Sequence, residues 1–365
     1  MTHDFWMTEA IRLARFGAGR VNPNPMVGAV IVKHDRVIGR GYHHAFGEAH
    51  AEREALRNCT ESPRGAALYV NLEPCCHHGK TPPCTDAMIE SGISSVVIGA
   101  LDPNPAVSGG GVAALRTAGI SVTTGILQAE CERLNAVFFH FISGNTPYVV
   151  MKYAMTADGK IATVSGAAKW ITGDMARAHV HETRNALAGI LVGIGTVLSD
   201  DPLLTCRLPN GRNPLRIVCD SRLQTPLDSR LVKTAKDVPT LIACCRADAG
   251  RAQALAEHGC RVLELPHPSG RVDLRALMET LHSEGVDSVL LEGGADLNFA
   301  MLQAELVQRL HIYLAPKIFG GVRAKSPVGG IGITLPQDAL RLSAPEITAL
   351  GDDLLLEYDV LKGGG

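Results

Sequence analysis

The sequence has little of what marks a protein that binds nucleic acid. Its 365 residues carry a formal net charge of −2, and no tract of lysine and arginine occurs along the chain. Aromatic residues make up only 4%. A basic surface interleaved with stacking aromatic side chains is therefore not expected, and we expect no nucleic-acid partner.

Long hydrophobic runs and a secretory pattern are also missing. The longest apolar run, residues 186–198, contains three glycines and a threonine and is shorter than the ~20 residues that a membrane span needs. The N-terminus shows no basic–apolar–small signal pattern. Ten cysteines in a chain of this length do not make a secreted disulfide framework. We expect a cytoplasmic protein with reduced thiols and no membrane partner.

Length and hydrophobic content indicate two α/β domains. Hydrophobic residues make up 46% of the chain, enough for two cores. The polar segment 143–147 places the boundary between residues 1–145 and 146–365. The first part is expected to contain a hairpin over 27–42, then repeated helix–strand units in a three-layer sheet, and a last helix over 128–142. The second is expected to be α/β, with a late antiparallel pair at 310–315 and 353–360.

One stretch carries the ligands of a catalytic metal. His50 and Glu52 form an H-x-E motif, and Cys75 follows a proline, with eight residues between it and Cys84. One imidazole and two thiolates suit Zn²⁺ with a fourth position open for water. H-x-E followed by P-C and a second cysteine is typical of zinc deaminases, in which the glutamate is general acid/base and not a ligand. We therefore expect Glu52 to carry protons during hydrolytic removal of a ring amine.

A closed, structural zinc site is the alternative for these residues. Such a site needs a fourth protein ligand. Cys76, His77 and His78 lie between the two cysteines and are candidates for it.

The same motifs resemble the RibD family of bifunctional riboflavin-biosynthesis enzymes. His50-Ala-Glu52, the run from Leu72 to Cys84, Asn22–Gly28 and Asp102–Pro105 match its deaminase half. The resemblance implies a cytidine-deaminase-like fold and 2,5-diamino-6-(5-phosphoribosylamino)pyrimidin-4(3H)-one as substrate. It further implies substrate contacts from Asn24, His43, His77 and Lys80. Turn chemistry could equally explain Asn24, and Lys80 could simply be solvated.

The second half resembles the reductase part of the same family. The matching segments are 152–160, 169–172, 195–202, 204–207 and 291–294. The resemblance implies a dihydrofolate-reductase-like fold that binds NADPH and reduces the ribosyl group to ribityl. The implied cofactor positions are Ala154, Trp170, Thr196, Asp200, Ser221, Gly293 and Gly294. The implied substrate positions are Ala168, Arg184, Leu204, Arg207 and Glu292.

For some of these residues an ordinary structural role is an alternative to the functional one. Arg184 and Arg207 suit bidentate binding of a phosphate, but surface arginines are as common. Gly293-Gly294 could admit a phosphate at a helix N-terminus or be only a turn. Trp170 could pack on the nicotinamide or lie in the core, and Glu292 could bind the pyrimidine edge or cap a helix.

Three readings of the whole chain remain at this point. The leading one is a zinc deaminase followed by an NADPH reductase. The others are a deaminase with a non-catalytic scaffold as its second half, and a deaminase of nucleic-acid bases. We also expect a homo-oligomer.

Overall fold

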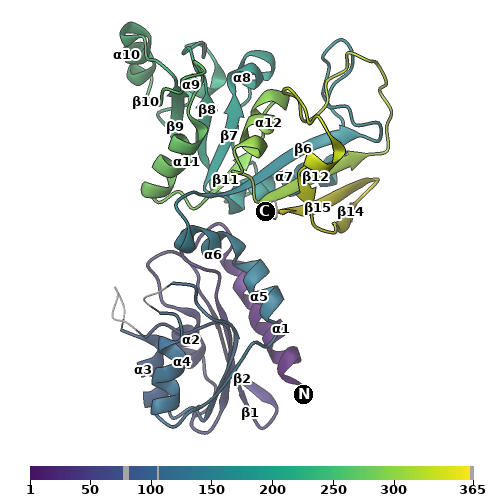
Figure 1. Cartoon of the computed structure of the whole chain (residues 1–365). Coiled ribbons are helices and arrows are strands. Elements are labelled where there is room, and N and C mark those ends of the chain that lie inside the picture. The colour runs from purple at the N-terminus through teal and green to yellow at the C-terminus, as the bar shows by residue number, and fades with distance from the viewer. Residues whose placement is uncertain (77–81, 105–106, 362–365) are drawn as a thin grey trace. The chain divides into compact units, whose positions relative to one another are not determined.

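The chain folds into two compact units. The computed structural model describes residues 1–76, 82–104 and 107–361 (Figure 1). Unit 1 spans Met1–Asn145 and unit 2 spans Thr146–Gly365. Each unit has its own sheet and its own hydrophobic core. No helix in the described part of the chain is both long and apolar enough to span a bilayer.

Unit 1 is built on a mixed five-stranded sheet. Its strands are β1 (Gly28–Lys33), β2 (Arg36–Tyr42), β3 (Ala67–Leu72), β4 (Ser95–Ala100) and β5 (Ser121–Thr124). They lie in the order β2-β1-β3-β4-β5. The β1–β2 hairpin is antiparallel as predicted, whereas β3, β4 and β5 pair in parallel. The carboxyl ends of β3 and β4 therefore lie together.

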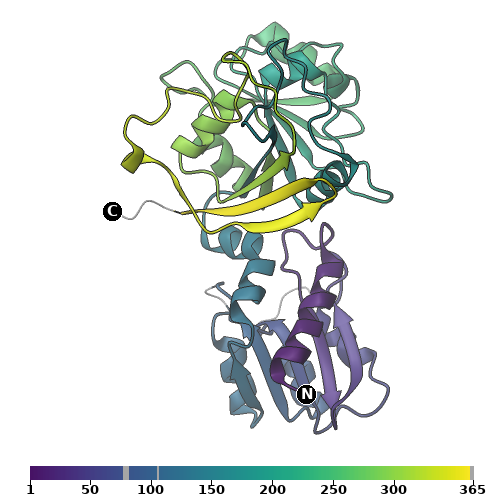
Figure 2. The same cartoon turned by 90° about the vertical axis from the view of Figure 1, so that its right-hand side faces the viewer.

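Helices cover both faces of this sheet. They are α1 (His3–Ala14), the 3₁₀ turn η1 (Arg15–Gly17), α2 (Ala51–Arg57), α3 (Cys84–Ser91), α4 (Gly110–Thr117), α5 (Gln128–Leu134) and α6 (Ala136–Ser143). Alternate side chains of each strand point to opposite faces. Ile31 thus packs with α2, α3 and α4, while Val30 packs with α1 and α5. Figure 2 shows α1 (purple) against the strands. The three-layer prediction is confirmed.

The predicted single helix over residues 128–142 was wrong. The structure divides it into α5 and α6 at Asn135, whose backbone leaves the helical region at φ −107° and ψ 22°. Apolar periodicity alone did not reveal the break. The Asn135 side chain is committed to the main chain of Met26, more than a hundred residues away in sequence.

Unit 2 is built on a larger sheet in the order β10-β9-β8-β7-β11-β6-β12-β15-β13, with β14 beside β15. Its strands are β6 (Tyr148–Thr156), β7 (Gly189–Gly193), β8 (Leu215–Cys219), β9 (Thr240–Cys244), β10 (Cys260–Glu264), β11 (Ser288–Leu291), β12 (Arg309–Ala315), β13 (Arg341–Leu342), β14 (Glu346–Leu350) and β15 (Asp353–Leu361). Neighbours from β10 to β12 are parallel. The predicted antiparallel β12–β15 pair is confirmed.

The helices of unit 2 are α7 (Asp174–Ala186), α8 (Ile194–Asp200), α9 (Arg230–Lys233), α10 (Ala249–Glu257), α11 (Leu274–Ser283) and α12 (Ala295–Gln303), with the 3₁₀ turn η2 (Pro336–Asp338). The main core packs α11 and α12 against one face of the central strands. Helix α7 packs on β12 and β15 through Ala176, Tyr313 and Leu355. The segments after β7, β8 and β11 meet at one edge, where ligands bind in parallel α/β sheets.

Candidate active sites

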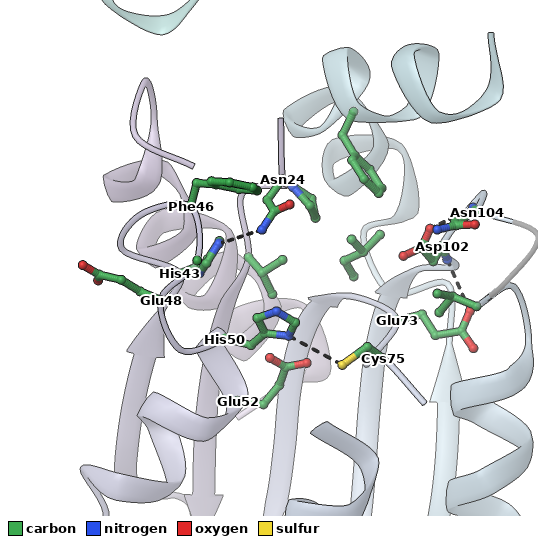
Figure 3. A pocket seen from close by; sticks show the side chains of 16 residues that line it. Asn24, His43, Phe46, Glu48, His50, Glu52, Glu73, Cys75, Asp102 and Asn104 are labelled. Carbon is green, nitrogen blue, oxygen red and sulfur yellow. Dashed lines mark hydrogen bonds between the residues drawn. The ribbon is translucent and has the colours of Figure 1, made fainter. Parts of the chain in front are cut away.

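Three predicted metal ligands meet in unit 1. The Nδ1 atom of His50 lies 3.5 Å from the Sγ of Cys75 and 3.3 Å from the Sγ of Cys84. The three ligand atoms lie within 4.8 Å of one another. Figure 3 shows His50 and Cys75 facing each other at the bottom of a pocket. Atoms at these separations can share one ion.

Local structure explains how the three residues converge. His50 is the residue before α2, Cys75 follows the carboxyl end of β3, and Cys84 opens α3. The backbone N–H of Cys84 donates to the Sγ of Cys75 over 3.4 Å. Exposed N–H groups at a helix start favour a thiolate over a thiol.

The sulfur pair is suited to a cation. The hydrogen bond from Cys84 and the contact with His50 lower the pKa of Cys75 to about 4. The pKa of Cys84 is raised, because its thiol bonds to the Cys75 sulfur and is buried. On its own the pair thus holds one negative charge, and a divalent cation allows both thiols to ionise. The donor set therefore fits zinc.

Glu52 lies beside these ligands, and one of its carboxylate oxygens has no hydrogen-bond partner among the described residues. Its side chain is 3% exposed, and its Oε2 atom is buried with no partner within the described residues. Burial raises the pKa of this carboxyl. A buried, unpaired carboxylate oxygen is costly unless it serves a ligand. Its placement fits a group that exchanges protons with a water on a metal.

No fourth protein ligand is found within the residues that the structure describes. The metal-type cluster there contains only His50, Cys75 and Cys84. Cys76 is partly buried but outside it. His77, His78 and Lys80 lie outside the described residues. The set of three fits a catalytic site better than a closed structural one.

A cavity of about 290 Å³ opens above the ligands. Asn24 and His43 lie in its wall, and the Nδ2 of Asn24 is 3.3 Å from the Nε2 of His43 (Figure 3). The remaining lining residues are Pro25, Val27, Phe46, Gly47, Glu48, His50, Glu52, Leu72, Glu73, Cys75, Asp102, Asn104, Val107 and Phe138.

Glu73, which is not among the predicted site residues, shapes this cavity. The Glu73 carboxylate is buried and accepts hydrogen bonds from the backbone N–H groups of Asp102, Gly109 and Val112. It thereby holds the start of α4 and the segment that lines the pocket. A glutamate at a strand end before Pro74-Cys75 was the available signal, but its partners are distant in sequence.

A second cluster of charges lies in unit 2 around Glu292, which follows β11. Arg184 of α7 donates to both carboxylate oxygens at 2.8 and 3.0 Å, and the Nζ of Lys152 lies 3.6 Å away. Burial alone would raise the pKa of Glu292, but the charges of Arg184 and Lys152 outweigh it and lower the pKa to about 2. The third guanidinium contact of Arg184 is the Thr205 carbonyl at 3.1 Å.

Arg184 therefore binds a protein carboxylate through two guanidinium nitrogens and orients Glu292. Its contact with substrate stays a prediction. Arg207 is exposed, and its Nε contacts the Nε2 of His181 at 3.1 Å. Burial and the nearby Arg184 and Arg207 lower the pKa of His181 to about 4. An imidazole kept neutral among cations indicates a positive site that suits an anion.

The predicted cofactor positions of unit 2 lie on several elements. Ala154 is on β6, Thr196 and Asp200 are in α8, Ser221 follows β8, and Gly293-Gly294 joins β11 to α12. Strand order brings the segments after β7, β8 and β11 to one edge. A Cβ built on Gly195 or Gly294 would meet nothing within 4 Å, so the backbone is open to a ligand there. These features fit an extended cofactor with phosphates.

The remaining predicted residues lie in two loops. Trp170 is 59% exposed, and the Arg177 guanidinium lies 4.7 Å from its ring centre. It is therefore not a core residue. Ala168 is exposed in the same loop, between β6 and α7. Leu204 is buried with a left-handed backbone, φ 51°.

Fold and sites together define a zinc-type deaminase joined to a second α/β enzyme unit. The family model described as the RibD C-terminal domain matches residues 147–356. The cytidine and deoxycytidylate deaminase zinc-binding region matches residues 1–100. The chain belongs to the RibD family, the bifunctional deaminase/reductases of riboflavin biosynthesis.

Relatives cover both units. The riboflavin biosynthesis protein RibD of Actinobacillus pleuropneumoniae is 50% identical over 99% of this chain and 96% of its own. Its counterpart in Escherichia coli (strain K12) is 38% identical over 98% and 99%. The Acinetobacter baumannii RibD structure, form 1, has a TM-score of 0.87 at 35% identity, covering 99% of each chain.

The predicted fold class and function are confirmed by these relationships. Unit 1 has the cytidine-deaminase-like fold and unit 2 the dihydrofolate-reductase-like fold of RibD. The enzyme combines a zinc-dependent deaminase with an NADPH-dependent reductase. The match to the RibD C-terminal domain supports a reductase in the second half of the chain, in place of a non-catalytic scaffold.

Proposed function

We propose that residues 1–145 deaminate 2,5-diamino-6-(5-phosphoribosylamino)pyrimidin-4(3H)-one and that residues 146–365 reduce the ribosyl group of the product with NADPH. The Thermotoga maritima structure named as this deaminase and 5-amino-6-(5-phosphoribosylamino)uracil reductase supports the choice of substrate. It is 37% identical over 98% of this chain, with a TM-score of 0.83. The observation that carries the first step is the buried Glu52 carboxylate beside three converging metal ligands, with its Oε2 atom left without a partner among the described residues.

In the deaminase site, His50, Cys75 and Cys84 hold zinc, and Glu52 moves protons. Bound zinc supplies a water activated near neutral pH. Glu52, buried and beside the ligands, would carry the two protons of this water in turn, the first to the ring nitrogen and the second to the departing amine, which leaves as ammonia. Its raised pKa suits a group that must be protonated and deprotonated in turn.

Asn24 and His43 orient the pyrimidine. The Nδ1 of His43 lies 3.1 Å from the Ala49 carbonyl, which can only accept, so Nδ1 carries the proton and Nε2 accepts from Asn24. The carboxamide oxygen of Asn24 then points away from His43 (Figure 3). It is available to an amino group on the ring. His77 and Lys80 remain proposed substrate contacts on the sequence resemblance alone.

In the reductase site, Glu292 binds the pyrimidine edge and Arg207 binds the phosphate. Glu292 stays ionised because Arg184 and Lys152 hold it, so it offers an acceptor to ring N–H groups. Arg207, exposed near the neutral His181, is the proposed phosphate contact. Leu204 and Ala168 complete the proposed substrate set.

The cofactor lies along the edge formed after β7, β8 and β11. Bound NADPH supplies a hydride. The glycine turn Gly293-Gly294 at the start of α12, open at Gly294, receives a phosphate, and Thr196 and Ser221 donate hydrogen bonds to the cofactor along this edge. Ala154, Trp170 and Asp200 are the other proposed contacts. Comparing steady-state rates with NADPH and NADH tests the choice of nicotinamide.

Two further proposals concern the whole chain. All ten cysteines are unpaired in the structure, which supports a reducing compartment such as the cytoplasm. We also propose a homo-oligomer, for which sedimentation of the purified protein is the direct test.

One experiment tests both catalytic steps. The diamino substrate is supplied to the full chain with and without NADPH, and products are resolved by mass. Without NADPH we expect only replacement of the ring amine by oxygen, and with it the further gain of two hydrogens. Reduction without prior deamination would contradict the order, and no product without NADPH would contradict independent deamination.

A further inference from the structure

Two buried asparagines hold the main chain of a segment that lines the deaminase pocket. Asn71 of β3 accepts from the N–H of Gly28 at 2.8 Å and donates to the carbonyl of Met26 at 3.0 Å. Asn135, between α5 and α6, accepts from the N–H of Met26 at 2.8 Å and donates to the same carbonyl at 2.9 Å. Their side chains are 0% and 2% exposed.

These hydrogen bonds take the place of strand pairing, because Met26 precedes the first paired residue of the sheet. Strand β1 starts at Gly28, so the backbone groups of Met26 have no strand partner. Buried peptide groups need partners, and here both come from side chains. Each carboxamide uses its donor and its acceptor on this one segment, which fixes both position and direction of the chain.

The clamped segment leads directly to the pocket. Asn24, Pro25 and Val27 all line the cavity and flank Met26. Prolines at 23 and 25 restrict the backbone, so a shift of Met26 is passed on to Asn24. The Asn24 amide bonds His43, which bonds the Ala49 carbonyl beside the ligand His50.

Asn135 also adjoins a second segment that lines the pocket. Helix α6 begins at the next residue, and the N–H of Phe139 bonds the Asn135 carbonyl at 2.9 Å. Phe138, in the first turn of α6, lines the same cavity as Asn24. One residue thus ties together two segments that line the pocket.

We infer that Asn135, together with Asn71, is a positioning residue of the deaminase: it acts through the Met26 main chain to hold Asn24 where the pyrimidine binds. This inference rests on the proposed contact of Asn24 with substrate. Neither asparagine touches the cavity itself. They contribute by holding Asn24 in the orientation that binds the substrate.

A double-variant cycle in the full-length enzyme tests this role. Asn135→Ala, Asn24→Ala and the combined variant are compared by kcat and KM for deamination, with zinc content and thermal unfolding measured in parallel. Asn58→Ala is the control, because it removes one hydrogen bond, to the Arg40 carbonyl, elsewhere in unit 1. We expect Asn135→Ala to keep its zinc and lower kcat/KM roughly tenfold. In the Asn24→Ala background the same change should have little further effect.

Three results would overturn the inference. An unchanged kcat/KM in Asn135→Ala, or an equal loss with and without Asn24, would show that Asn135 stabilises the fold only. A normal kcat/KM in Asn24→Ala would reject the proposed role of Asn24 as well, whereas the first two leave that role intact. If Asn135→Ala loses zinc, Asn135→Asp, which keeps the acceptor for the Met26 N–H, takes its place in the cycle.

Discussion

Each unit contains a glutamate that is largely shielded from solvent, and the two have opposite electrostatic surroundings. Glu52 in unit 1 has an oxygen without a partner, and burial raises its pKa. Glu292 in unit 2 receives both nitrogens of an arginine fork and faces a lysine, and its pKa falls to about 2. The first can exchange protons, and the second is a fixed negative charge. Neighbouring charges, not residue type, decide which chemistry a carboxylate performs.

Metal removal should produce the largest difference between the activities of the two units. A chelator that strips zinc is expected to abolish deamination, because no activated water remains, while reduction of pre-deaminated substrate continues. Assays of ammonia release and NADPH oxidation on one preparation measure both. Re-addition of zinc should restore the first activity. Full deamination by protein shown to lack metal would reject the three-ligand centre.

Glu52→Gln should come next in size. The variant should keep its zinc yet lose about 10²- to 10⁴-fold in deamination rate, the usual contribution of a general acid/base. Reduction of pre-deaminated substrate should be unchanged. Zinc content serves as the control for folding of unit 1. A normal deamination rate would show that Glu52 is not the proton carrier.

Glu292→Gln should instead destabilise its unit. Loss of the carboxylate leaves the partly buried side chains of Arg184 and Lys152 without a counter-charge, and we expect the free energy of unfolding to fall by up to about 3 kcal/mol. Glu284→Gln is the matched control, since its pair with Arg261 is largely exposed and should be worth less than about 1 kcal/mol. Equal effects in denaturant titrations would contradict a buried ion pair at Glu292.

The pH dependence of stability should also reveal the ion pairs of Glu292. Glu292 takes up a proton near its ordinary value of 4.5 when unfolded but only near about 2 when folded. Its stabilising contribution is therefore complete above about pH 4.5 and is lost as pH falls toward 2. The difference in unfolding free energy between wild type and Glu292→Gln should shrink over that window. A difference independent of pH would mean that the pair is not ionic.

The smallest effect should come from Cys76→Ser. Cys76 lies beside the metal ligands in sequence but outside their cluster. Zinc per chain and deamination rate should stay within about twofold of wild type, because three protein ligands suffice for a catalytic site. Loss of zinc would identify Cys76 as a fourth ligand and the site as structural.

Sequence patterns determined the metal centre and the layer order. Metal binding and proton transfer require particular residue types, so the motif of His50, Glu52, Cys75 and Cys84 can be recognised in the sequence. These residues also lie next to a strand and helices that local patterns predict. The β1–β2 hairpin and the β12–β15 pair were likewise readable, since alternation and turn residues are local signals.

Only the tertiary structure decided the partners of the remaining polar residues. Nothing in the local sequence of Asn135 shows that it ends a helix to hold Met26, that Glu73 binds the start of α4, or that Arg184 grips Glu292. Each of these contacts joins segments far apart in the chain. A side chain's hydrogen-bonding capacity is set by its type, but its partner is set by which backbone the fold brings within reach.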